Sequence, residues 1–274
     1  MNMQEKIAIL GMTDIGKVRH KNEDSIGYDS ALGLIVLADG MGGHRGGEVA
    51  SSLAVDLIVG NIQQKLSKEA PGENVTQTEF TSASVYLQDA VKSANKKIFE
   101  KAETDSEQKG MGTTVVALLF HNGNFSLVHI GDSRCYRLRG SQLQQITKDH
   151  SLLQELVDRG FYTSEEAQKS VKKNLVTRAL GIEPDVKVDL LEDIVLKKDI
   201  YLLCSDGLTD LVEDTDIYLT INQFSDNLEK AAKQLIKMAN QKGGKDNISV
   251  ILCRIDENFS SRLDWRTKIM SWFD

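Results

Sequence analysis

The sequence predicts an α+β protein built of two packed antiparallel β-sheets with helices on their outer faces. Apolar runs that read as strands recur along the whole chain, and two long segments with helical periodicity follow the second of these runs. The middle of the chain then alternates strands and tight turns without an intervening helix. Parallel strands would need such crossover helices, so antiparallel pairing is expected.

Seven runs rich in Val, Ile and Leu, most of them bounded by Gly, Asp or Asn, are the expected strands. The pair "TTVVALLF" and "FSLVHI" forms a hairpin with Asn122 and Gly123 in its turn, and "LRGSQLQQI" supplies another tight turn. The middle of the chain is therefore expected to be an antiparallel meander. The seven runs are residues 6–12, 32–38, 113–120, 125–131, 134–140, 199–205 and 247–255.

Three segments carry apolar stripes at helical spacing: residues 48–66, 83–102 and 228–239. We interpret all three stripes as core packing. Residues 150–181 are polar and broken into short helices, with Thr163 and Glu166 spaced as a capping box, and are expected to leave the sheets as an excursion. Residues 67–79 are expected to form an exposed loop.

Composition excludes several classes of protein. The 274 residues carry a net charge of −7, whereas binding to nucleic acid requires a basic face. Three cysteines in apolar runs without a CxxC spacing indicate buried, reduced thiols. We find neither a signal peptide nor a run near the roughly 20 apolar residues of a membrane span, so a cytoplasmic protein is expected. A monomer is expected as well, although the sequence alone leaves the oligomeric state open.

Four aspartates occur where apolar strands end or begin. Asp39, Asp132 and Asp206 each follow a strand and precede a small or turn-forming residue, and Asp246 directly precedes one. Carboxylates gathered at one rim would repel one another unless a cation held them. Because these ligands are oxygens, Mg²⁺ or Mn²⁺ is expected, and two such ions lower the pKa of a shared water for attack on a phosphate ester.

A cation for the phosphate stands just after the first strand. Arg19 is followed closely by Asn22, Glu23 and Asp24, and the planar guanidinium of arginine can bind two phosphate oxygens at once. Glu23 and Asp24 would hold metal waters or orient Arg19. A solvated charged turn is the alternative interpretation of this stretch.

Together these stretches resemble the metal-dependent protein serine/threonine phosphatases of the PP2C family, in their bacterial form. The matching stretches occur in the family's order and cover roughly residues 11–255. They are "RHKNEDS", "VLADGMGGH", "GMGTT", "HIGDSRCYRLRG", "ITKDHS", "VTRALG", "LLCSDGLTD" and "KDNISVIL".

The resemblance implies an αββα four-layer sandwich with a binuclear Mg²⁺ or Mn²⁺ centre at one end. Residues 1–257 would be the catalytic domain, with a flap at 150–181, and residues 258–274 an amphipathic appendage. Asp39 would bridge the ions, and the glycines after it would keep side chains away from them. The other implied roles are Gly40 as a carbonyl ligand, Asp206 and Asp246 on the second ion, Asp132 with Asp206 on a third, weaker ion, Glu23 and Asp24 through metal-bound water, and Arg19 on the phosphate.

The sequence departs from the eukaryotic pattern at one position. Met41 stands where many eukaryotic members have a histidine that is discussed as the proton donor to the leaving serine oxygen. His44, a metal-bound water or bulk water could supply this proton instead. Gly112, Thr113 and Thr114 are expected to pack under the site, and Asp210 would either hold a metal water or cap the following segment.

The implied activity is hydrolysis of phosphoserine and phosphothreonine in proteins, opposing a cognate bacterial Ser/Thr kinase. A catalytically weak phosphatase-like module that binds phosphoproteins is the non-enzymatic alternative, and a two-metal phosphodiesterase is a third. Trp265, Ile269 and Trp272 form an aromatic face in the C-terminal segment, for which docking on the body and partner binding both remain open.

Overall fold

The computed structural model describes residues 3–42, 46–68, 80–163, 166 and 175–257. Within them two antiparallel sheets form, one in the strand order β1-β11-β10-β7-β8 and the other in the order β2-β3-β5-β6-β9, with β4 paired to β3. The strands are β1 Ile7–Asp14, β2 Asp24–Asp29, β3 Leu34–Met41, β4 Gly112–Thr113, β5 Val115–His121, β6 Asn124–Ile130, β7 Arg134–Arg139, β8 Gln142–Gln145, β9 Asp189–Ile194, β10 Ile200–Cys204 and β11 Ile248–Ile255.

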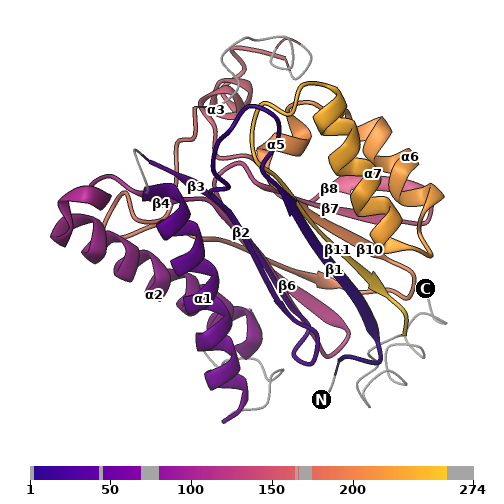
Figure 1. Cartoon of the computed structure of the whole chain (residues 1–274). Helices are drawn as coiled ribbons and strands as arrows, with labels where there is room; N and C mark the ends of the chain where they lie inside the picture. The colour runs from indigo at the N-terminus through magenta and orange to yellow at the C-terminus, as the bar shows by residue number, and fades with distance from the viewer. Residues whose placement is uncertain (1–2, 43–45, 69–79, 164–165, 167–174, 258–274) are drawn as a thin grey trace.

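The longer helices cover the outer faces of the two sheets (Figure 1). α1 and α2 pack on one sheet, and α6 and α7 pack on the other. This arrangement confirms the predicted α+β sandwich. The helices are α1 Gly46–Leu66, α2 Ser82–Thr104, the 3₁₀ turn η1 Ser106–Gln108, α3 Leu152–Asp158, α5 Asp206–Thr209, α6 Asp214–Gln223 and α7 Leu228–Gln241.

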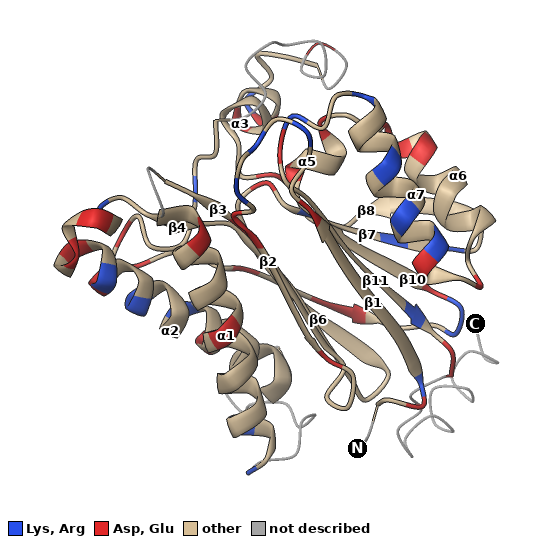
Figure 2. Ribbon diagram, in the orientation of Figure 1, with Lys and Arg blue, Asp and Glu red and all other residues tan. Residues whose placement is uncertain are grey.

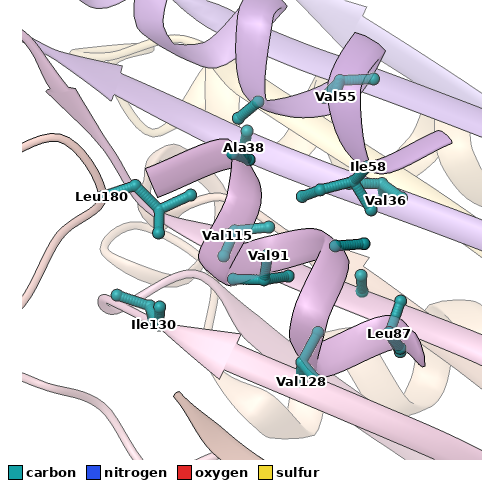
Figure 3. Close-up of a cluster of buried hydrophobic side chains, with 14 of the residues drawn as sticks. Val36, Ala38, Val55, Ile58, Leu87, Val91, Val115, Val128, Ile130 and Leu180 are labelled. Carbon is teal, nitrogen blue, oxygen red and sulfur yellow. The ribbon is translucent and has the colours of Figure 1, made fainter. Parts of the chain in front are cut away.

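Buried apolar side chains form three layers between these elements. The middle layer lies between the sheets, where Tyr201 packs edge-on against Phe120 and Phe125 with ring centroids 5.2 Å apart in both pairs. One outer layer joins α1 and α2 to their sheet (Figure 3), and the other joins α6 and α7 to theirs. Burial of this apolar surface is the main driving force for the fold.

The predicted apolar stripes of α2 and α7 are buried, which confirms them. In α1 the buried face differs from the predicted stripe. It includes Ala50, Ala54, Ile58 and Ile62, which face the sheet. Of the predicted stripe, Val49, Leu53 and Leu57 are only partly buried. Small residues let the helix approach the sheet closely: a Cβ on Gly27 of β2 would collide with Val55.

The strand prediction differs from the structure in two respects. β2, β8 and β9 were not among the seven predicted strands, because each is an edge strand with mixed exposure instead of an apolar run. The predicted meander is wrong at one step, since the chain changes sheets between β6 and β7. This crossing occurs in the short turn at Gly131–Ser133, which therefore sits where the two sheets meet.

The structure tests some of the smaller predictions and leaves others untested. The Thr163 backbone N–H donates to Glu166 and the Glu166 N–H donates back to Thr163, which confirms the capping box. All three cysteines are buried and free. His44, most of the 67–79 loop and the 258–274 appendage lie outside the described residues. No helix in the described ranges combines the length and the apolar character that a membrane crossing requires.

Candidate active site

The acidic residues singled out above meet at one end of the sandwich (Figure 2). Asp39 lies near the end of β3, and Asp24 begins β2 directly opposite it in the strand register. Asp206 begins α5 two residues after the end of β10, and Asp246 lies two residues before β11. The antiparallel order explains this convergence, because strands that end and strands that begin alternate along the same rim.

The carboxylates at this rim lie close enough to raise the pKa values of one another. The pKa of Asp39 is raised well above its ordinary value by burial, and then by the negative charges of Asp24 and Asp206. Burial also raises the pKa of Asp206 well above its ordinary value, and the negative charge of Asp132 raises it more than that of any other neighbouring group. A cation placed among these groups would relieve both effects.

Burial dominates the pKa of the two flanking aspartates. Desolvation raises the pKa of Asp24 to about 6, against hydrogen bonds from Ser249 and Ser205 that lower it. Desolvation, followed by the charge of Asp149, raises the pKa of Asp132 to about 6. The rim therefore carries several carboxyl groups whose charged forms the fold alone does not stabilise.

Two carboxylate oxygens at this rim are buried without a hydrogen-bond partner: Oδ1 of Asp24 and Oδ1 of Asp206. The other oxygen of Asp24 accepts a hydrogen bond from Ser205 at 2.8 Å. A buried oxygen without a donor is costly, and a hard divalent cation would satisfy it. As placed, no three of the described Asp, Glu, His and Cys side chains form a closed ligand shell. The donor set nevertheless fits a hard cation, because it consists of oxygens.

Arg19 lies at the edge of this acidic group. Its Nη2 donates to Oδ2 of Asp246 at 2.6 Å, and its side chain is 53% exposed. The stretch that carries Arg19 is thus attached to the carboxylate rim instead of forming an isolated solvated turn. An exposed guanidinium beside the carboxylates is positioned to meet an anionic ligand from solvent.

The fold holds Asp39 through its backbone. The Asp39 N–H donates to Oγ1 of Thr114 at 3.0 Å, and its carbonyl accepts from the Thr114 N–H at 2.8 Å and from Oγ1 of Thr113 at 2.9 Å. We expected the two threonines to pack beneath the site, and they also form hydrogen bonds that position Asp39. Threonine supplies both a donor and an acceptor on a stiff side chain, which suits this role.

The glycines after Asp39 also have a steric role within the fold. The Gly40 N–H donates to the Glu23 carbonyl at 3.0 Å, and a Cβ on Gly40 would collide with the carbonyl of Gly47. A Cβ on Gly47 would in turn meet Oε2 of Glu23 at 2.5 Å. These two glycines allow β3, the start of α1 and the Glu23 backbone to approach one another.

Asn247 is a residue of the site that the sequence interpretation missed. Its Oδ1 accepts from the Glu23 N–H at 2.8 Å, and its Nδ2 donates to the carbonyls of Ile15 and Lys21 at 3.0 and 2.8 Å. The buried amide thereby holds both ends of the loop that carries Arg19. Its position next to Asp246 in "KDNISV" was a signal that could have pointed to it.

Comparison with known proteins assigns this arrangement to a family. The model of the family "Protein phosphatase 2C" matches residues 17–252. The serine/threonine phosphatase stp of Listeria monocytogenes is 37% identical over 247 residues, covering 89% of this chain and 94% of that protein. The serine/threonine protein phosphatase PstP of Mycobacterium tuberculosis is 41% identical over 244 residues, 89% of this chain and 44% of that longer protein.

Solved structures agree with the sequence relationship. The crystal structure of the Mycobacterium tuberculosis phosphatase PstP/Ppp superposes with a TM-score of 0.81 at 38% identity, over 92% of this chain and 100% of the other. A PstP catalytic domain in complex with two manganese ions superposes with a TM-score of 0.78 at 38% identity, over 92% of this chain and 99% of that one. The chain therefore belongs to the protein phosphatase 2C family and is a serine/threonine phosphatase.

Proposed function

We propose that this phosphatase hydrolyses phosphoserine and phosphothreonine in proteins by means of two divalent cations held at the carboxylate rim. The observation that carries the proposal is the convergence of Asp39, Asp206 and Asp24, whose mutual repulsion raises the pKa of Asp39 well above its ordinary value. The two manganese ions of the related PstP structure support the same assignment. The cation is Mg²⁺ or Mn²⁺.

The proposed ligands follow from the positions of the oxygens. Asp39 would bind both ions and Gly40 would offer its carbonyl, while Asp206 and Asp246 would hold the second ion. Asp132 and Asp206 together would hold a third, weaker ion. The charge of Asp132, which raises the pKa of Asp206 more than any other neighbouring charge does, supports this pairing. Glu23 and Asp24 act through water, since Asp24 keeps one buried oxygen without a partner.

The chemistry needs a nucleophile, a cation for the phosphate and a proton donor. When bound, a pair of divalent ions would lower the pKa of a water held at the rim, and this water would serve as the nucleophile, so that the phosphate would pass to water without a phosphoenzyme. Arg19 binds the phosphate oxygens from the edge of the site, after its guanidinium leaves Asp246. The proton for the leaving serine or threonine oxygen comes from His44 or from water.

The proposal extends to the substrates, the location and the domain organisation of the enzyme. The substrates are phosphoproteins made by a cognate Ser/Thr kinase, and the enzyme acts as a cytoplasmic monomer without a nucleic-acid partner. Residues 1–257 form the catalytic domain, residues 150–181 its flap, and residues 258–274 an appendage. The net charge of −7 supports the exclusion of nucleic acid.

Phosphopeptide hydrolysis by Asp39→Asn tests the proposal. The variant should lose turnover in saturating Mn²⁺ while its melting temperature is retained or raised, because it removes a buried charge. Asp89→Asn, on the exposed face of α2, is the matched control and should keep full turnover. Wild-type activity that survives a chelator, or an Asp39→Asn variant of normal rate, would refute the metal assignment. Phosphopeptide binding without turnover in the wild type would favour the binding module instead.

A further inference from the structure

His150 joins the turn after β6 to the segment that leads into α3. Its backbone N–H donates to the Gly131 carbonyl at 2.8 Å, and the Gly131 N–H donates to Nδ1 of the His150 ring at 3.0 Å. One residue therefore satisfies both backbone groups of Gly131, which directly precedes Asp132. The side chain of His150 is 8% exposed, so water does not readily replace these bonds.

The hydrogen bonds assign the tautomer of His150. Because a backbone N–H can only donate, Nδ1 must be the acceptor, and the ring proton sits on Nε2. Nε2 lies 3.1 Å from Oδ2 of Asp189 and 3.0 Å from Nη1 of Arg178. Two donors do not bond, so Nε2 donates to Asp189, and Arg178 donates to Oδ1 of Asp189 at 2.7 Å. Asp189 thus orients the ring that holds Gly131.

The turn held by His150 has little freedom to move. Gly131 has a φ of +105°, and a Cβ there would lie 2.6 Å from Cβ of Thr114. Ser133, at the other end of the turn, shares a hydrogen bond of 2.7 Å with Oγ1 of Thr114. Thr114 is also the residue that holds the backbone of Asp39. Asp132 is therefore presented from a turn fixed to the same support as Asp39.

The other side of His150 faces the described end of the 150–181 excursion. Its carbonyl accepts a hydrogen bond from the Thr177 N–H at 2.8 Å, and the next residue, Ser151, forms a β-bridge with Val176. Arg178 follows directly and pairs with Asp189. The two ends of the excursion are therefore joined at His150.

We propose that His150 is a positioning residue of the active site, which holds the Gly131–Ser133 turn so that Asp132 faces Asp206, and which links this turn to both ends of the flap. The inference rests on the proposed role of Asp132 in binding a cation. It assigns to His150 no contact with substrate or ion. A buried histidine that only contributes to stability is the competing explanation, and a measurement of cation binding separates the two.

Two substitutions divide the functions of the ring. In His150→Asn, Oδ1 stands as many bonds from the backbone as Nδ1 does, so it can still accept from the Gly131 N–H. In His150→Gln, the amide reaches toward Asp189 but leaves that N–H without an acceptor. His121→Gln is the matched control, because His121 is also buried, at 3% exposure, and pairs with Ser126 at the far end of β5.

The experiment measures Mn²⁺ binding to the full chain from the electron paramagnetic resonance signal of free Mn²⁺, together with thermal unfolding and phosphopeptide hydrolysis. His150→Gln should weaken the binding of the weakest ion by about tenfold, the lower end of what loss of an outer-shell partner costs. His150→Asn should restore most of this affinity. In an Asp132→Ala background the difference between the two variants should vanish.

The outcomes separate this inference from the proposed function. A wild type that binds no Mn²⁺ overturns the proposed function itself. A wild type that binds Mn²⁺ normally, with His150→Gln equal to it or with His150→Asn impaired as strongly as His150→Gln, overturns the role of His150. Loss of melting temperature in both variants, with Mn²⁺ binding unchanged as in His121→Gln, shows a purely structural role.

Discussion

Arg19 and Asp246 form an ion pair of 2.6 Å although 227 positions separate them in the chain. The pair joins the loop before β2 to the loop before β11 at the edge of the carboxylate rim. Both partners are needed elsewhere in the proposed reaction, since Asp246 would bind a cation and Arg19 a phosphate. Each ligand therefore displaces one half of the pair, and a partly exposed pair of this kind contributes little stability that would be lost.

Replacement of Arg19 by alanine should raise the KM for a phosphopeptide by roughly 10- to 100-fold, the usual value of a charge-assisted hydrogen bond. Arg19→Lys should recover only part of this, because an ammonium lacks the planar fork. Steady-state kinetics at saturating Mn²⁺ measure both. Lys97→Ala, which breaks an exposed ion pair with Glu100 on α2, is the control. An unchanged KM in Arg19→Ala would remove Arg19 from the site.

Replacement of Asn247 by alanine should lower the free energy of unfolding by about 1–3 kcal/mol, because buried groups of Glu23, Ile15 and Lys21 lose their partner. It should also raise the KM, since the loop that carries Arg19 is released. Urea unfolding and phosphopeptide kinetics are the two measurements.

Asn95 provides a matched control for this prediction. It is equally buried, accepts from the Gly181 N–H, and donates to the carbonyls of Glu183 and Pro184. Asn95→Ala should lose similar stability while KM stays near the wild-type value. A similar rise of KM in both variants would show that Asn247 has no special relation to the site.

Replacement of Gly40 by alanine should destabilise the protein by about 1–3 kcal/mol, the usual cost of overpacking, because its Cβ would collide with the Gly47 carbonyl. Gly60→Ala is the matched change in α1, where nothing lies within 4 Å of the new Cβ. It should stabilise the helix by up to about 1 kcal/mol. Chemical unfolding of both variants checks the pair, and equal effects would show that space around Gly40 does not matter.

Much of the fold could be predicted because its central strands are continuous apolar runs and because α2 and α7 carry apolar stripes that are buried. β2 and β9 escaped prediction because they are edge strands, whose residues Leu191 and Ile194, for example, are exposed. Such strands depend on their neighbours more than on their own composition. The change of sheet at Gly131–Ser133 could not be predicted either, because the sequence of a tight turn does not indicate which sheet the next strand joins.

The types of residue that form the site could be predicted from the sequence, whereas the residues that hold them in place could not. Acidic residues beside apolar strands indicated the rim, whereas the position of Asp24 opposite Asp39 depends on the register of a strand that was not predicted. The roles of Asn247 and Thr114 could not be foreseen, because they consist of hydrogen bonds to backbone groups distant in sequence. Such partners are known only once the chain is folded.

His129 should make stability depend on pH. Burial, followed by the charge of His150, lowers the pKa of His129 to about 3. Between this value and the unfolded pKa of about 6.5 the unfolded chain binds the extra proton, so the free energy of unfolding rises with pH, by about 1.4 kcal/mol per unit for one such group. Above the unfolded pKa of about 6.5 the contribution of neutral His129 to the free energy of unfolding is fully present, and below the folded pKa of about 3 it is fully lost.

Urea unfolding of wild type and His129→Gln across this range, with a chelator present, isolates the effect. Asp24 and Asp132, whose pKa values are raised to about 6, act with the opposite sign in both proteins and cancel in the difference. The slope of stability against pH should fall in the variant by close to one proton. An unchanged slope in His129→Gln would show that the fold does not lower the pKa of His129.

The central claim is that Asp39, Asp206 and Asp246 together hold divalent cations. Anomalous diffraction at the manganese edge, from crystals grown with Mn²⁺, tests it most directly. Two strong peaks should lie between these three carboxylates, with Asp39 in contact with both, and the ion pair between Arg19 and Asp246 should be open. A map without manganese at this rim, with the three side chains apart and the pair intact, would contradict the account.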